Sequence, residues 1–99
     1  MAKLAAEDLR SQLTTLPGWN TVGDAIHKEF RFPGFRDAIG FVNRIADLAE
    51  AARHHPDLEI HYDRVLVSLS THDEGGVTER DLALAREIEG ATGSEPDAG

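Results

Sequence analysis

Cysteine is absent from the 99 residues of the sequence. A chain without cysteine forms no disulfide bond, no thiolate metal site and no dithiol redox pair. Long apolar runs are absent too, so we expect no segment that crosses a bilayer. Residues 1–8 also lack the apolar core of a secretory signal peptide. These absences favour a cytoplasmic protein with no membrane partner.

Positive charge is scarce as well. Ten Lys and Arg residues stand against 18 Asp and Glu residues, which gives a net charge of −8. An acidic protein repels phosphate backbones, so we expect no direct binding to nucleic acid. The length allows one small domain. We expect this domain to span residues 1–92 and to be followed by a disordered polar tail at residues 93–99.

Three segments place apolar residues at the spacing of an amphipathic helix. They are residues 4–16, 35–54 and 79–91. Pro56 predicts the end of the second helix, because the residue before a proline disfavours helical geometry. His54 is therefore expected in the last helical turn, with His55 just beyond it.

Four short segments alternate apolar and polar residues, as strands with one buried face do. They form two pairs joined by short turns, residues 19–22 with 25–32 and residues 58–62 with 65–69. Trp19, Phe30 and Phe32 are expected in the core, and Lys28 interrupts the apolar face of its strand. The element order α-β-β-α-β-β-α predicts an α+β fold: a four-stranded antiparallel sheet with three helices packed on one face.

Four of the five histidines lie in the segment from Glu50 to Asp81. Histidine transfers protons in both directions near neutral pH, because its unperturbed pKa is about 6.5. His54 and His55 form an adjacent pair, and His72 opens a loop that contains two glycines. Three histidines at element boundaries, bracketed by two carboxylates, indicate an acid/base site.

Two other interpretations of these histidines have to be weighed. Imidazoles at the end of a helix can act only as cations that interact favourably with the helix dipole. A metal site is disfavoured, because adjacent histidines point in different directions. The sequence also contains neither cysteine nor an HExxH motif. We therefore expect no metal.

The carboxylates and the tyrosine of this segment have alternative roles. Asp81 is the third residue after Thr78, so it either completes a capping box or orients a histidine. Glu50 is four residues before His54, and we expect it to orient that imidazole rather than remain a solvated helix carboxylate. Tyr62 either fills the core or lines the site.

The segment resembles the pterin-4a-carbinolamine dehydratase family. The family pattern is a charged residue, three spacers, His-His-Pro, an aromatic residue, a second histidine, and an aspartate beyond a short loop. The matching positions are Glu50, His54, His55, Pro56, Tyr62, His72 and Asp81. The loop at residues 71–81 is similar to the second signature of the family, and the resemblance extends over about residues 5–91.

The resemblance implies a hydro-lyase that dehydrates a 4a-hydroxytetrahydropterin to the quinonoid dihydropterin. Such an enzyme recycles the pterin cofactor of aromatic amino acid hydroxylases. No metal or redox cofactor is implied, because the pterin is the substrate. A homodimer or homotetramer is also implied, and this agrees with the open edges of a small antiparallel sheet.

The resemblance also implies roles for individual residues. His54 and His72 would form the acid/base pair at the 4a-hydroxyl, and His55 would hold or polarise the pterin ring. Which histidine gives the proton and which takes it stays open. Glu50 and Asp81 would orient imidazoles or hydrogen-bond the heterocycle. The remaining substrate-binding or orienting positions are Pro56, Tyr62, Thr71 and Asp73.

The sequence departs from the family pattern at two places. Leu58 stands where an aromatic residue is often found, and Pro33-Gly34 stand at a cap position that is often acidic.

A second interpretation of the whole sequence is a non-catalytic interaction module of the same fold, either an assembly chaperone or a transcriptional dimerisation cofactor. Assembly factors that resemble the family tend to lack the paired histidines. This sequence retains them, which favours the enzyme.

Overall fold

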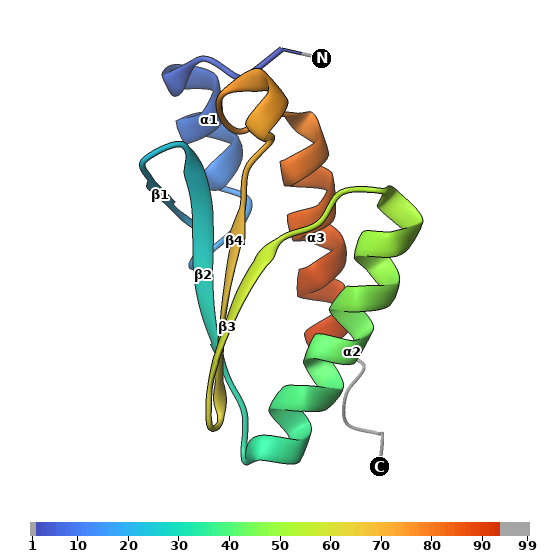
Figure 1. The fold of residues 1–99 in the computed structure, drawn as a ribbon. Coiled ribbons are helices and arrows are strands. Elements are labelled where there is room, and N and C mark those ends of the chain that lie inside the picture. Colours follow the sequence, from blue (N-terminus) through green and yellow to red (C-terminus); the bar gives the residue numbers. More distant parts are fainter. Residues whose placement is uncertain (1, 94–99) are drawn as a thin grey trace.

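Four antiparallel strands form one sheet in the computed structural model, which describes residues 2–93 (Figure 1). The strands are β1 (Asn20–Val22), β2 (Ala25–Arg31), β3 (Asp57–His61) and β4 (Arg64–Leu69), in the spatial order β1-β2-β4-β3. The two hairpins join through the pairing of β2 with β4. The predicted α+β fold is therefore confirmed.

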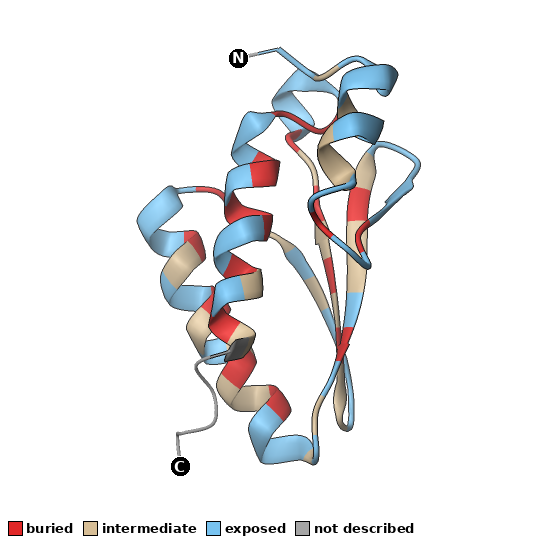
Figure 2. Ribbon diagram, turned by 180° about the vertical axis from the view of Figure 1, so that it is seen from behind, coloured by how far each residue is buried: buried red, intermediate tan, exposed pale blue. Residues whose placement is uncertain are grey.

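Three helices pack against one face of this sheet. They are α1 (Ala6–Leu13), α2 (Phe35–Ala52) and α3 (Glu79–Gly93). Buried positions recur along α2 and α3 on the sides that face the sheet (Figure 2). α1 is tied to α3, because Nη2 of Arg86 donates to the side chains of Gln12 and Thr15, at 3.0 and 3.2 Å. Within residues 2–93, no helix is both long enough and apolar enough to cross a membrane.

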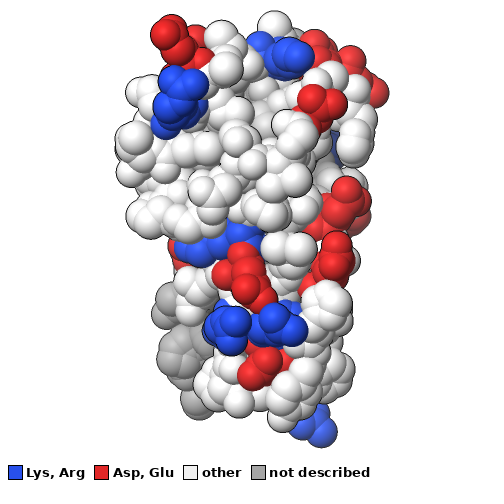
Figure 3. Space-filling model, turned by 90° about the vertical axis from the view of Figure 1, so that its left-hand side faces the viewer, with Lys and Arg blue, Asp and Glu red and all other residues white. Residues whose placement is uncertain are grey.

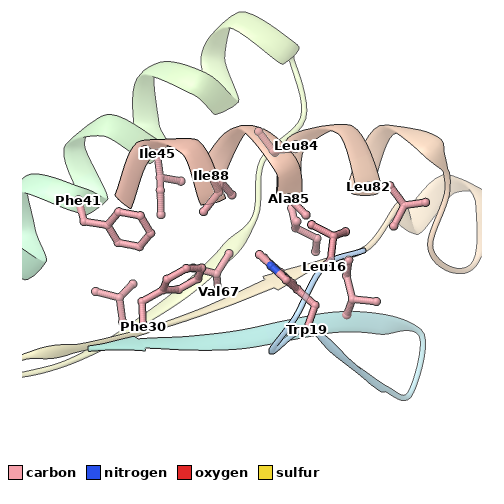
Figure 4. Packing of buried hydrophobic residues seen from close by; sticks show 14 of the residues in the cluster. Leu16, Trp19, Phe30, Phe41, Ile45, Val67, Leu82, Leu84, Ala85 and Ile88 are labelled. Carbon is pink, nitrogen blue, oxygen red and sulfur yellow. The ribbon is translucent and has the colours of Figure 1, made fainter. Parts of the chain in front are cut away.

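The core lies between the sheet and the helices α2 and α3 (Figure 4). Phe41 and Ile45 from α2 and Ile88 from α3 have no exposed surface, and they face Phe30 and Val67 of the sheet. The rings of Phe30 and Phe41 lie 4.8 Å apart between centroids. Tilted aromatic pairs at this distance add attraction beyond the burial of their area. This layer holds the ends of α2 and α3 in a fixed relation to the sheet.

Lys28 lies within this apolar face, and the structure shows how it is accommodated. Its ammonium contacts Glu89 of α3 at 2.5 Å and the carbonyl of Pro17 at 2.9 Å. The indole N–H of Trp19 donates to the same Glu89 oxygen at 2.9 Å. The ammonium also lies 4.9 Å from the centre of the Phe30 ring. Paired and packed in this way, Lys28 joins α3 to the sheet where the sequence pattern predicted a break.

None of the helices within residues 2–93 lies over the opposite face of the sheet (Figure 1). Figure 3 shows this side of the molecule, with charged side chains of both signs in its lower half and again at its upper end. Glu29 lies between two cations, 3.1 Å from Arg64 and 3.9 Å from Arg31. Such exposed pairs contribute little to stability, so the helix side carries most of the packing energy.

The first helix is shorter than the predicted residues 4–16. Before it, the Leu4 N–H donates to the carbonyl of Val77 at 2.8 Å. After it, the hydroxyls of Thr14 and Thr15 each bond to a carbonyl three residues earlier, at 2.7 Å. Side-chain bonds of this kind compete with helix continuation. At the other end of the chain, residue 93 belongs to α3, and the rest of the predicted tail lies outside the described residues.

Candidate active site

The candidate site begins where α2 ends. Arg53 adopts the left-handed conformation, with φ 55°. The N–H of His54 donates to the Ala49 carbonyl at 3.1 Å, and that of Arg53 donates to the Glu50 carbonyl at 3.3 Å. This is the bond pattern of a Schellman motif. The helix therefore stops at Ala52, and the prediction that His54 lies in its last turn is wrong.

A contact from α3 supports this turn. Nη2 of Arg80 donates to the carbonyl of Arg53 at 2.7 Å. The bond occupies a carbonyl that the end of α2 leaves without a helical partner. It also ties the residue before His54 to the first turn of α3, where Asp81 lies. The two elements that carry these residues are therefore joined by a bond from a side chain to the backbone as well as by the bond between the two side chains.

His54 and Asp81 form a buried pair across this junction. Nε2 of His54 lies 2.5 Å from Oδ1 of Asp81. His54 is 9% exposed and Asp81 is 0% exposed. Water is excluded from the carboxylate, so its hydrogen bonds must all come from the protein. The pair joins residues that are 27 positions apart in the sequence.

The second oxygen of Asp81 has its own donors. Oδ2 accepts the Thr78 backbone N–H at 2.9 Å and the Thr71 hydroxyl at 2.8 Å. Oγ1 of Thr78 in turn accepts the N–H of Arg80 at 3.2 Å. Thr78 and Asp81 thus form a capping box at the start of α3. Asp81 therefore takes both of the roles considered for it, one with each oxygen.

The other ring nitrogen of His54 is open. In the described part of the chain, every buried side-chain nitrogen or oxygen has a hydrogen-bond partner. Nε2 is the His54 ring atom that takes part in a bond, so Nδ1 is not among the buried atoms and reaches the surface. One nitrogen is held by Asp81 and the other is not fully buried, an arrangement suited to proton transfer.

His55 has a different carboxylate partner. Its Nε2 lies 2.7 Å from Oε2 of Glu50, and both side chains are exposed. The expectation that Glu50 orients His54 is therefore wrong. The reason is the turn at Arg53, which ends the helical periodicity before His54. Pro56 follows His55 and is half-buried.

His72 lies at the same end of the sheet. Asp57 pairs with Ser68, so the chain just before β3 and the chain just after β4 are neighbours. His72 opens a 3-10 turn, η1 (His72–Glu74), and is exposed together with Asp73. Gly75 at φ 78° closes this loop, in a conformation that glycine adopts readily. His72 is thus one residue from the Thr71 hydroxyl that binds Asp81.

Tyr62 is far from these residues within the chain. β3 runs away from the site, and at about 3.3 Å per residue Tyr62 lies roughly 17 Å from Asp57. Tyr62 occupies the turn between β3 and β4 at φ 54° and is 69% exposed. Its ring stacks on Phe35, with centroids 6.5 Å apart. Neither expected role for Tyr62, core or site wall, holds in the single chain.

Sequence reasoning missed the contributions of Thr78 and Arg80. The capping-box spacing placed Thr78 at a helix start, but it gave no sign of a hydroxyl partner in Thr71. The two hydroxyl oxygens lie 2.8 Å apart and are both buried. No sequence signal marks Arg80, because its partner is a backbone carbonyl.

Within residues 2–93, neither a group of metal-ligating side chains nor the cavity beside α1 coincides with these residues. Across residues 2–93, no three His, Cys, Asp or Glu side chains are grouped so that they could hold a metal. A cavity of about 620 Å³ lies between α1, the β1–β2 turn and residues 75–77. It is lined by Leu9, Leu13 and Trp19 rather than by the histidines.

Comparisons with known proteins agree on one family. A family model described as "Pterin 4 alpha carbinolamine dehydratase" matches residues 2–91. A protein of Thermomicrobium roseum is 52% identical over 88 residues, which cover 89% of this chain and 95% of that protein. A protein of Thermosynechococcus vestitus is 50% identical, over 87% of this chain and 90% of that protein. Both carry the provisional name pterin-4-alpha-carbinolamine dehydratase.

Two solved structures share the fold. One, from Brucella melitensis, is described as a transcriptional coactivator/pterin dehydratase. It matches with a TM-score of 0.87 and 38% identity, over 90% of this chain and 97% of that chain. The other is described as a pterin dehydratase-like RuBisCO assembly factor of the alpha-carboxysome. It matches with a TM-score of 0.65 and 20% identity, over 78% of this chain and 89% of that chain, a likeness of fold alone.

Proposed function

Since the chain belongs to the pterin-4-alpha-carbinolamine dehydratase family, we propose that it dehydrates a 4a-hydroxytetrahydropterin to the quinonoid dihydropterin. The observation that carries this proposal is the His54–Asp81 pair, with Nδ1 of His54 open to a ligand. An imidazole backed by a buried carboxylate is a good proton acceptor, because the carboxylate stabilises the imidazolium that forms.

The reaction needs two proton transfers. His54 takes the proton from N5 of the pterin, and the electron pair of that N–H bond forms the new double bond between N5 and C4a. The bond between C4a and the hydroxyl oxygen breaks, and His72 gives a proton to the departing hydroxyl, which leaves as water. His72 is exposed and can exchange protons with solvent. No electrons are lost or gained overall, so the reaction calls for no redox cofactor, and in this scheme the two imidazoles carry both proton transfers.

The exposed pair binds the heterocycle in this scheme. The Glu50 carboxylate binds Nε2 of His55. The other ring nitrogen of His55 is left for the pterin ring. Asp73 lies on the same loop as His72 and is exposed, so it is placed to meet polar atoms of the substrate. A pterin is rich in ring nitrogens and amide groups, and each of these side chains offers a matching donor or acceptor.

The direct test is the dehydration of enzymatically generated 4a-hydroxytetrahydropterin, followed by ultraviolet absorbance. The wild-type protein should accelerate the decay, and His54→Ala and His72→Ala should each lose about 10²–10⁴-fold of that rate, the usual contribution of general acid/base catalysis. His61→Ala is the matched control, because His61 lies on β3 and pairs with Glu59 at 3.3 Å. A wild-type rate equal to the uncatalysed decay would exclude the dehydratase.

We also infer a homo-oligomer. β3 is an edge strand, and unpaired strand edges in native proteins are covered or protected. Large apolar side chains are exposed at this edge, with Ile60 at 42%, Phe35 at 50% and Tyr62 at 69%. Light scattering that reports a monomer at micromolar concentration would exclude this proposal. We place the reaction in the cytoplasm, in keeping with a cysteine-free chain.

The other candidate is a non-catalytic interaction module. It is favoured by the same exposed apolar edge, which suits a protein partner as well as a second copy. The retained histidines and their buried carboxylate argue for catalysis, because a binding module has no need of a paired imidazole with a free nitrogen. An inactive protein that captures a defined partner through the β3 edge would establish this alternative.

A further inference from the structure

The hydrogen-bond directions around Asp81 can be worked out atom by atom. The backbone N–H of Thr78 is a donor only, so Oδ2 of Asp81 must accept from it at 2.9 Å. The Thr71 hydroxyl donates to the same oxygen at 2.8 Å. Both neighbours of Oδ2 are therefore donors, and this side of Asp81 has to be an acceptor.

The direction of the Thr71 bond is set by Thr78. A hydroxyl has one proton to give. The Thr71 proton goes to Asp81, so Thr71 can only accept from Thr78, whose oxygen lies 2.8 Å away. The Thr78 oxygen accepts the N–H of Arg80 at 3.2 Å, which leaves its own proton for Thr71. The chain of donors thus runs from the Arg80 backbone through two hydroxyls to Asp81.

We propose that Thr71 and Thr78 are positioning residues that hold Asp81 as a pure acceptor, so that His54 keeps its proton on Nε2 and presents Nδ1 to the substrate. The side chains of Thr71, Thr78 and Asp81 in this network are buried, with Thr71 at 7% and both Thr78 and Asp81 at 0% exposure. Neither hydroxyl has a proton left for a ligand. Thr71 therefore acts through Asp81, which is the orienting one of the two roles expected for it.

The network predicts the result of an isosteric change at Asp81. In Asp81→Asn the two donors at the Oδ2 position require the amide oxygen there. The amide nitrogen then takes the place of Oδ1 and donates to Nε2 of His54. The imidazole must move its proton to Nδ1, the atom that faces the substrate. The variant keeps its shape but carries the wrong tautomer.

The tautomer claim does not depend on the proposed function, and its test needs no substrate. Long-range ¹H–¹⁵N correlation spectra of the histidine rings distinguish the Nε2–H and Nδ1–H forms. The wild-type protein should show His54 as the Nε2–H form, and Asp81→Asn should show it as the Nδ1–H form. Asp47→Asn is the matched control, because Asp47 lies exposed on α2. A wild-type Nδ1–H form, or an unchanged form in folded Asp81→Asn, overturns the proposal.

The part played by the hydroxyls is tested in the Asp81→Asn background. Adding Thr71→Val removes one of the two donors that orient the amide, so both tautomers of His54 should appear. Adding Thr71→Ser keeps the hydroxyl, so His54 should still show only the Nδ1–H form. If the valine variant shows the same single form as Asp81→Asn, Thr71 does not position Asp81.

Turnover then connects the tautomer to the proposed reaction. Asp81→Asn should lower kcat by about 10²–10⁴-fold, as when a catalytic histidine is held in the wrong tautomer. If the wild-type protein is inactive but shows the expected tautomers, the proposed dehydratase function is wrong and the proposed positioning network stands. An Asp81→Asn variant that shows the inverted tautomer and full activity would instead show that Nδ1 is not the reacting atom.

Discussion

Two histidines that are neighbours in the sequence form carboxylate pairs of nearly equal length in different surroundings. His54 lies 2.5 Å from Asp81, with side chains 10% and 0% exposed. His55 lies 2.7 Å from Glu50, with side chains 61% and 76% exposed. From the distances alone, the two histidine–carboxylate interactions would be expected to have similar strength. Burial separates them, because charges near water are screened while buried groups must satisfy one another.

The difference separates two tasks within one site. The buried pair has every donor and acceptor assigned, so the orientation of His54 is set before any substrate arrives. The exposed pair can rearrange, since water replaces either partner at little cost. A catalytic group gains from a fixed position, whereas a group that meets a substrate ring gains from freedom to adjust. This division supports His54 as the base and His55 as a binding residue.

The largest expected effect comes from cutting the buried pair. Asp81→Ala leaves the His54 ring, the Thr71 hydroxyl and the Thr78 N–H without their acceptor. Loss of one member of a buried hydrogen-bonded pair costs about 3 kcal/mol in the free energy of unfolding. Urea denaturation measures this quantity. Glu50→Ala is the matched cut in the exposed pair, and it should change the same free energy by less than about 0.5 kcal/mol.

If Asp81→Ala and Glu50→Ala lost the same free energy of unfolding, the contrast between the buried and the exposed pair would be contradicted. An equal loss of this free energy in Asp81→Ala and Asp81→Asn would contradict it too. The amide still accepts from Thr71 and Thr78, so this variant should recover much of the loss. The asparagine variant therefore separates the stabilising role of Asp81 from its effect on the His54 tautomer.

A smaller effect is expected when the exposed histidine is removed. His55→Ala should lower kcat/KM about tenfold, equivalent to about 1.4 kcal/mol. The change should fall mainly on KM, because His55 binds the pterin and transfers no proton in the proposed scheme. Steady-state kinetics with the 4a-hydroxypterin measure both constants. A fall in kcat as large as that of His54→Ala would show that the exposed pair also takes part in the chemistry.

Most of the fold could be predicted from local patterns. Alternation along β4 and helical spacing along α2 identified the buried residues, because each element has to bury one face. The turn at Gly23 was predicted as well, and its φ of 58° shows why glycine stands there. The second turn lies one residue earlier than expected, and Tyr62 occupies it in a left-handed conformation that side chains rarely favour.

Less of the site could be predicted, because its contacts depend on how distant elements meet. The capping-box spacing of Thr78 and Asp81 is local, and it is present. The His54–Asp81 pair spans two elements, and no spacing rule predicts it. Glu50 was assigned to His54 by the rule for residues four apart on a helix. That rule fails here, since the left-handed turn at Arg53 ends the helix before His54.

Added salt should weaken the coupling energy of the exposed His55–Glu50 pair but not that of the buried His54–Asp81 pair, and this effect is smaller than the preceding ones. In 1 M salt the screening length is about 3 Å, so exposed charges interact little. A double-mutant cycle with Glu50→Gln and His55→Asn should give a coupling energy of about 0.5 kcal/mol at low salt and near zero in 1 M NaCl. The cycle with Asp81→Ala and His54→Ala should give a coupling energy that salt does not remove. A salt-independent coupling for the exposed pair would count against the division of tasks.

The smallest effect concerns the turn from which both histidines emerge. The left-handed conformation of Arg53, with φ 55°, destabilises the folded state by about 1 kcal/mol or more for a residue with a side chain. Glycine has no such strain, but its greater freedom in the unfolded chain lowers stability by about 0.5–1 kcal/mol. Arg53→Gly should therefore raise the free energy of unfolding by about 0.5 kcal/mol, measured by urea denaturation. The Arg53 carbonyl and its bond from Arg80 remain, so the positions of both histidines and kcat/KM should be unchanged. A more stable variant with lower activity would instead place the Arg53 guanidinium at the substrate, beside the exposed pair.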